Sequence, residues 1–267
     1  MSTILKALEK ASASDERSEA LAAAAKGPGF VPLFRVARTV APSNAALRRA
    51  GWISALASPP KEALPFAAVA EQILTQVPAP ARVLVCGASA GAGATATSLN
   101  LATEIALSGR ATALWSEIPR EPSSLLRLLG PLCPHGLWDH LCRKMPLHDV
   151  ILHSRVPGLQ LLPARGAQTL PADQPTLEAL DAFYEEACEI GGDRYVVVDA
   201  PPPLVSRETA ALAKRSEMTV FVVAAGTPKA LVSEAADALE GAPRTLLILS
   251  RAARWLNGRP SGRAEAG

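Results

Sequence analysis

Short runs of β-branched and other apolar residues alternate with longer stretches of helical pattern through most of this chain. Because these runs are apolar throughout, they are typical of strands that helices cover on both faces. The alternation predicts a doubly wound α/β domain with a mostly parallel sheet. The predicted strands are residues 83–86, 112–115, 159–162, 195–198, 219–223 and 245–249, and the predicted helices are 61–76, 94–108, 123–129, 137–143, 176–190 and 229–239.

The two ends of the chain have a different character. Residues 1–60 predict an N-terminal extension, in which a helical pattern is followed by an irregular linker interrupted by prolines. Residues 61–255 then form the predicted domain, and residues 256–267 a flexible tail.

The amino-acid composition and the net charge argue against several classes of function. Apolar residues make up 49% of the 267, which favours a folded globule. The formal net charge of +2 does not demand a nucleic-acid partner, so none is expected. No stretch approaches the roughly 20 apolar residues that cross a bilayer, and the first residues lack the order of a secretory signal. With four cysteines and no CxxC pair, a cytoplasmic location is expected.

A glycine-rich segment joins the first predicted strand to its helix. Glycines in this position let backbone N–H groups converge on a phosphate at a helix N-terminus. Against the Walker A pattern G-x-x-x-x-G-K-[ST], Gly93 and Thr95 match, whereas Ala88 and Ala94 replace the first glycine and the lysine. The nucleotide-binding candidates, in vestigial form, are therefore Gly91, Gly93, Ala94 and Thr95. An ordinary tight turn between strand and helix is the alternative interpretation.

The missing lysine weakens the nucleotide hypothesis. A charge-assisted contact to phosphate is worth roughly 1.5–3 kcal/mol, which is about ten- to a hundred-fold in affinity. No lysine lies between Lys61 and Lys144. Arg82 or Arg110 could replace it only by reaching the loop.

Five further segments resemble motifs of one known family, in the same order and with fitting spacing. They are 98–102 (A-A-N-L-A in the family), 120–125 (R-R-P-S-L), 136–141 (G-L-x-D-x-L), 156–164 (P-G-L-x-x-L-P-A-G) and 193–202 (D-Y-V-I-I-D-T-P-P). With the loop, they make most of the chain similar to bacterial tyrosine autokinases. That family resembles chromosome-partitioning ATPases in fold, so the resemblance implies a P-loop NTPase-like domain.

The resemblance also implies site residues. Asp199 stands at the family's Walker B position, and it would hold Mg²⁺ together with Thr95. The family's D-A-D motif maps onto residues 116–118, where only Glu117 is acidic, and strand alternation would point that side chain to the other face. Ser250 stands at the position of the family's base-binding asparagine.

Two features of the family that serve oligomerisation and phosphorylation are missing. Residues 62–68 resemble its E-x-x-R-x-x-R helix with both arginines replaced. The only tyrosines are Tyr184 and Tyr195, so the C-terminal tyrosine cluster is absent.

Together these departures predict a degenerate, catalytically impaired autokinase-like protein, with ATP and magnesium bound weakly or not at all. The resemblance implies a role in capsule or exopolysaccharide synthesis or export. The partner would be a membrane polysaccharide co-polymerase or polymerase complex, which would hold the chain at the cytoplasmic face of the inner membrane. Two alternatives stay open: an active kinase or ATPase with a non-standard Walker A loop, and a positioning ATPase of the partitioning type.

Overall fold

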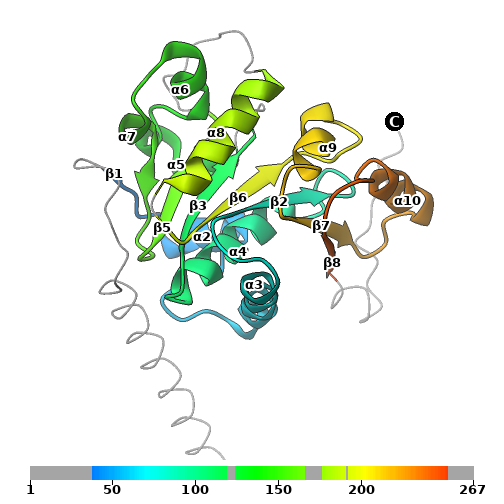
Figure 1. The fold of residues 1–267 in the computed structure, drawn as a ribbon. Helices are drawn as coiled ribbons and strands as arrows, with labels where there is room; N and C mark the ends of the chain where they lie inside the picture. Colours follow the sequence, from blue (N-terminus) through cyan, green and yellow to red (C-terminus); the bar gives the residue numbers. More distant parts are fainter. Residues whose placement is uncertain (1–37, 119–123, 166–175, 191, 252–267) are drawn as a thin grey trace, which may run out of the picture.

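The computed structural model describes residues 38–118, 124–165, 176–190 and 192–251 (Figure 1). Their centre is one eight-stranded sheet in the order β1-β4-β5-β3-β6-β2-β7-β8. All neighbouring strands are parallel except β4 and β5. The strands are β1 (Arg38–Thr39), β2 (Ala81–Gly87), β3 (Thr112–Glu117), β4 (Leu152–His153), β5 (Leu159–Leu162), β6 (Arg194–Ala200), β7 (Met218–Ala224) and β8 (Thr245–Ser250).

Helices cover both faces of this sheet, as the apolar strands require (Figure 1). One core lies between the sheet and α2 to α5, and the other between the sheet and α6 to α10. Along β2 the side chains alternate between the two cores. The helices are α2 (Asn44–Ala50), α3 (Leu64–Gln76), α4 (Ala94–Leu107), α5 (Ser124–Leu129), α6 (Leu137–Arg143), α7 (Leu147–Val150), α8 (Leu177–Glu189), α9 (Arg207–Ala213) and α10 (Lys229–Asp237), with 3-10 turns η1 (Lys61–Ala63) and η2 (Gly130–Leu132).

The predicted fold class is confirmed, and each predicted strand and helix is present. The boundaries differ by at most two residues, except that the predicted helix 61–76 begins with the 3-10 turn η1 and its α-helix begins at Leu64. Pro65 lies in the first turn of α3, where its missing N–H removes no hydrogen bond. The elements that the sequence pattern missed are all short: β1, α2, α7, β4 and α9. None of the described helices has the length and apolar character needed to span a membrane.

Residues 38–60 correct the predicted linker, because they pack on the domain. Val40 and Trp52 are each 1% exposed and belong to the core under α4. The backbone N–H of Val40 donates to the carbonyl of His153 at 2.7 Å, next to the pairing of β1 with β4. The apolar residues of this segment are spaced irregularly between prolines, so they produce no periodic pattern although distant segments bury them.

Asn100, in the segment that resembles A-A-N-L-A, forms hydrogen bonds between α4 and residues 38–60. Its side chain is fully buried. The side-chain oxygen accepts from the backbone N–H of Ser54 at 2.8 Å, and its amide donates to the carbonyls of Gly51 at 2.7 Å and Ala96 at 2.6 Å. This motif position therefore has a structural role in the chain.

The segment that resembles G-L-x-D-x-L is likewise explained by packing. A Cβ on Gly136 would lie 2.6 Å from the Cα of Arg165 and from the carbonyl oxygen of Pro163. The Asp139 carboxylate accepts from the backbone N–H of Gly136 at 3.0 Å and so caps α6. The glycine therefore allows α6 to pack closely on the chain that follows β5, and the aspartate caps that helix.

Candidate nucleotide-binding site

The glycine-rich loop leaves the carboxyl end of β2, with β6 on one side of that strand and β7 on the other. Gly91 has φ = 74° and Gly93 has φ = 98°, a region that residues with a Cβ rarely adopt. A Cβ on Gly87 would lie 2.9 Å from both the side chain of Ala92 and the Ser89 carbonyl oxygen, so the turn is tight. Gly93 is the N-cap of α4, and the loop therefore presents a helix N-terminus at the edge of the sheet.

Thr95 and Asp199, the two predicted magnesium-binding residues, lie together in the structure. The Thr95 hydroxyl donates to an oxygen of the Asp199 carboxylate at 2.8 Å. Thr95 is in the first turn of α4, and Asp199 is a fully buried residue near the end of β6. Residues more than a hundred positions apart thus meet at the carboxyl edge of the sheet, which is where ligands bind in folds of this kind.

Glu117 lies on the same face of the sheet as Asp199, which corrects the expectation that it points to the other face. In the parallel pair of β3 and β6, Glu117 is directly in register with Asp199. Two residues earlier on each strand, Trp115 and Val197 both belong to the core under α4. Because strand side chains alternate, the two carboxylates share that face. A sequence motif gives only the order of residues along one strand. Which side chains meet depends on the register between neighbouring strands.

The side chain of Glu117 also caps the N-terminal end of α5. One of its carboxylate oxygens accepts from the backbone N–H of Ser124 at 2.6 Å, at the first residue of that helix. A carboxylate at this position is stabilised by the unpaired N–H groups and the positive end of the helix. Glu117 is fully buried, so its contacts are inside the protein.

The donors at this edge fit the chemistry of a magnesium ion. Two carboxylates, Glu117 and Asp199, and the Thr95 hydroxyl are the hard oxygen ligands that Mg²⁺ takes. Among the described residues, no three or more His, Cys, Asp and Glu side chains gather into a metal centre. A magnesium ion here would therefore need water or a ligand to complete its coordination.

A triphosphate fits less well, because the loop itself supplies no positive charge. Ala94 presents a methyl group where the Walker A lysine stands. The two arginines that the sequence suggested as substitutes for the lysine are engaged elsewhere. Arg82 is the second residue of β2, at the end of that strand away from the loop, and it pairs with Asp181. Arg110 follows the far end of α4 and pairs with Glu71.

Two residues at the carboxyl end of β8 donate hydrogen bonds to the glycine loop. The Ser250 hydroxyl donates to the carbonyl of Ala92 at 2.6 Å, and the Arg251 guanidinium donates to the carbonyl of Gly91 at 2.7 Å. Ser250, at the predicted base-binding position, therefore lies directly against the loop. Sequence reasoning did not single out Arg251 for the site, because Arg251 and the glycine loop are far apart in sequence. They meet only because β8 pairs with β7.

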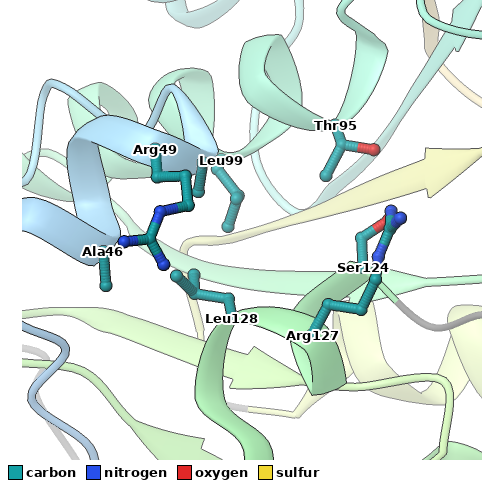
Figure 2. Close-up of a pocket in the computed structure, with 8 residues that line it drawn as sticks. Ala46, Arg49, Thr95, Leu99, Ser124, Arg127 and Leu128 are labelled. Atoms are coloured by element: carbon teal, nitrogen blue, oxygen red, sulfur yellow. The ribbon is translucent and has the colours of Figure 1, made fainter.

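A cleft opens beside Thr95, between α2, α4 and α5. Its volume is about 430 Å³, within the range of small-molecule sites. Figure 2 shows Arg49 reaching toward it from α2 and Arg127 from α5. Sequence reasoning missed this cleft because α2 lay in the predicted linker. Its lining residues are Ala46, Arg49, Ala50, Thr95, Leu99, Ser124, Arg127 and Leu128.

The side chains of Tyr184, Tyr195 and Cys86 are buried in the protein. Tyr184 and Tyr195 are at most 2% exposed, and burial raises the pKa of both phenols. Burial, together with the charge of Asp199, raises the pKa of the Cys86 thiol to about 12, so that thiol stays protonated at neutral pH. Neither tyrosine presents a hydroxyl at the surface as a phosphate acceptor.

A mostly parallel sheet, a glycine loop between β2 and α4, and an aspartate at the end of the adjacent strand define a P-loop NTPase-like α/β fold. Among solved structures, the chain is similar to the kinase domain of the Escherichia coli tyrosine kinase ETK. The TM-score is 0.55 and the identity 22%, over 70% of each chain.

Two further solved structures are similar. The kinase domain of VpsO gives a TM-score of 0.56 and 22% identity, over 71% of this chain and 96% of that one. The chimerical protein CapA2B2 gives a TM-score of 0.58 and 16% identity, over 86% of this chain and 97% of that one. At these identities the likeness establishes the fold. No protein-family model matches the chain, and no curated protein does.

Proposed function

We propose that this chain is a degenerate member of the bacterial tyrosine autokinase family that acts through protein–protein contacts and has given up phosphoryl transfer. The structural neighbours include domains whose names describe them as tyrosine kinase or kinase domains, which supports a kinase-like origin. The five motif segments in register support the same family.

One observation carries the proposal: the loop keeps its backbone shape, but an alanine stands where the motif has the lysine that would bind a triphosphate. Gly91 and Gly93 adopt positive φ, whereas Ala94 stands at the lysine position. The Arg251 guanidinium, which lies beside the loop, donates to the carbonyl of Gly91, and the Ser250 hydroxyl donates to that of Ala92. With both tyrosines buried, an acceptor for autophosphorylation is also missing from the described surface.

By this proposal the partner is a membrane polysaccharide co-polymerase or polymerase complex, and the chain lies at its cytoplasmic face during capsule or exopolysaccharide production. The motif resemblance supports this pathway. Deleting the gene is expected to lower polymer yield, and a chain with Asp199→Asn is expected to restore the yield in full. Failure of that variant to restore it, despite normal protein levels, would indicate that the acidic site is still in use.

Titration with Mg-ATP tests the loss of nucleotide binding. We expect millimolar or no affinity for the natural chain and a gain of about ten- to a hundred-fold in Ala94→Lys, because a charge-assisted phosphate contact is worth roughly 1.5–3 kcal/mol. Isothermal titration calorimetry measures both.

Ala90→Lys is the matched control, since it adds the same charge to an exposed, variable position of the same motif. Equal gains in Ala90→Lys and Ala94→Lys would show a nonspecific charge effect. Micromolar affinity of the natural chain would overturn the proposal.

A second candidate, an active magnesium-dependent nucleotide enzyme, is favoured by one arrangement. Glu117 and Asp199 face the same side in register, and Asp199 keeps its contact with Thr95. If this candidate holds, the natural chain hydrolyses ATP, and Asp199→Asn reduces hydrolysis without unfolding the domain. Phosphate release by the natural chain at the background rate excludes it.

A further inference from the structure

The strand at one margin of the sheet leaves apolar side chains exposed. β8 lies beside β7 (Figure 1), and its sequence, Thr-Leu-Leu-Ile-Leu-Ser, contains no charged residue, proline or glycine. Leu247 and Leu249 are 58% and 55% exposed. The residues in register with them on β7, Phe221 and Val223, are 1% and 8% exposed. The helical layer on this face therefore ends between the two strands.

The outer edge of β8 also presents backbone groups. The N–H of Thr219 on β7 donates to the carbonyl of Arg244 at 2.8 Å, just before β8 begins. Because alternate residues of a strand turn their N–H and C=O groups to the same side, the even-numbered residues of β8 bond to β7. The backbone groups of Thr245, Leu247 and Leu249 point away from the sheet. In the part of the chain that the structure describes, no further strand lies beyond β8.

The two margins of the sheet differ in their protection against pairing with another strand. Natural sheets protect an edge with a short strand, a charged side chain, a proline or a bulge. β1 at the other margin follows this rule, because it has two residues and one of them is Arg38. β8 has six residues, and its register with β7 runs without a bulge. Pairing with another strand is therefore favoured at β8 and disfavoured at β1.

The sequence of β8 is complementary to itself. Two copies related by a two-fold axis perpendicular to the sheet place their β8 strands antiparallel. With the axis at Leu247, this residue lies opposite its own copy, and Thr245 lies opposite Leu249. These are the three residues whose backbone groups point outward, so all of those groups find partners. On the other face Leu246 lies opposite Ile248. Every pair is uncharged, which suits a second copy of the same strand.

We propose that β8 pairs with β8 of a second copy of this chain, so that two sheets join into one. The pairing is independent of nucleotide binding and of the function proposed above. Because only one margin of each sheet is suited to pairing, assembly stops at the dimer. Five paired residues cover about 17 Å of edge at about 3.4 Å per residue. This contact is smaller than the roughly 800 Å² per partner of a standard interface, so the dimer is expected to dissociate in the micromolar range.

Sedimentation velocity of the full chain, over a series from low to high micromolar concentration, measures the dimer. Leu247→Lys is expected to weaken it at least about tenfold, because it places two like charges opposite each other at the axis. Since Leu247 is exposed, this variant is expected to fold normally. Val205→Lys is the matched control: it adds the same charge at a side chain that is 77% exposed outside β8, and it is expected to leave the dimer unchanged.

Three outcomes would overturn the proposal. A natural chain that stays monomeric at every concentration would show that this edge is covered by another part of the chain or serves a different protein. Equal weakening by Leu247→Lys and Val205→Lys would show a general effect of charge. A series of ever larger aggregates would show that assembly does not close at the dimer.

Oxidative cross-linking tests the position of the axis. The Cα atoms of a hydrogen-bonded antiparallel pair are about 5.5 Å apart, which a disulfide can span. With the exposed Cys142 changed to serine, Leu247→Cys is expected to form a covalent dimer. Leu249→Cys is the control, because it would lie about 13 Å along the strand from its own copy. Cross-linking of Leu249→Cys as fast as that of Leu247→Cys would contradict the pairing.

Discussion

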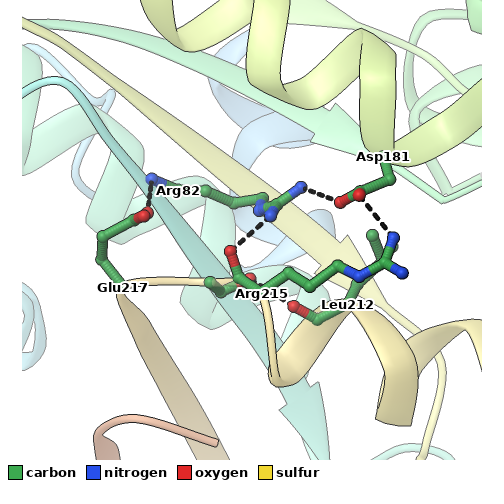
Figure 3. Close-up of polar contacts among 6 residues, drawn as sticks. Arg82, Asp181, Leu212, Arg215 and Glu217 are labelled. Carbon is green, nitrogen blue, oxygen red and sulfur yellow. Dashed lines mark hydrogen bonds and ion pairs between the residues drawn. The ribbon is translucent and has the colours of Figure 1, made fainter.

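Asp181→Ala is expected to lower the free energy of unfolding by roughly 3–5 kcal/mol, because it leaves a buried arginine without its counter-charge. Asp181 on α8 binds two arginines, one through each carboxylate oxygen (Figure 3). The contact with Arg82 measures 2.9 Å, and Arg82 is only 4% exposed. Arg82 also donates to the backbone carbonyl of Arg215, so this network joins β2, α8 and the turn between α9 and β7.

Denaturant unfolding followed by circular dichroism measures this loss. Glu185→Ala is the control, because it removes an exposed carboxylate from the same helix and is expected to change stability by about 0.5 kcal/mol or less. A double variant, Arg82→Met with Asp181→Leu, is expected to recover most of the loss, since it leaves no buried charge unpaired and the remaining partner, Arg215, is 48% exposed. A loss below about 1 kcal/mol in Asp181→Ala would show that solvent reaches Arg82.

The central part of the fold could be predicted from sequence because each element there is long and locally uniform. The predicted runs 83–86 and 195–198 are apolar throughout, and all seven residues of β2 and of β6 are buried. Short elements gave no such signal. β4 has two residues, and its antiparallel pairing with β5 depends on contacts that no local pattern encodes.

The location of the candidate site could be predicted from the sequence, but not the full set of side chains that meet there. Thr95 and Asp199 were predicted from motif positions and do meet. The side of the sheet that Glu117 faces was predicted wrongly, since the register of β3 against β6 is a tertiary property. Arg49 was missed for a similar reason: an exposed arginine in a predicted linker becomes a site residue only when α2 packs beside α4 and α5.

The segment that contains α2 depends on one large side chain. Trp52 is 1% exposed, and its indole N–H donates to the hydroxyl of Thr103 on α4 at 2.7 Å. Thr103 in turn donates to the carbonyl of Leu99 at 2.7 Å, so the contact ends in the backbone of α4. We expect Trp52→Ala to cost roughly 3–5 kcal/mol of unfolding free energy, as large aromatic truncations in cores do.

Two further variants make this prediction specific to the packing of the segment. Trp52→Phe keeps most of the buried area and loses the hydrogen bond, so we expect a smaller cost of about 1 kcal/mol plus that of the reduced ring volume. Val205→Ala, at a side chain that is 77% exposed, is expected to change stability by about 0.5 kcal/mol or less. If Trp52→Ala and Val205→Ala behave alike, residues 38–60 are a linker after all, and the cleft beside Thr95 loses the wall that α2 provides.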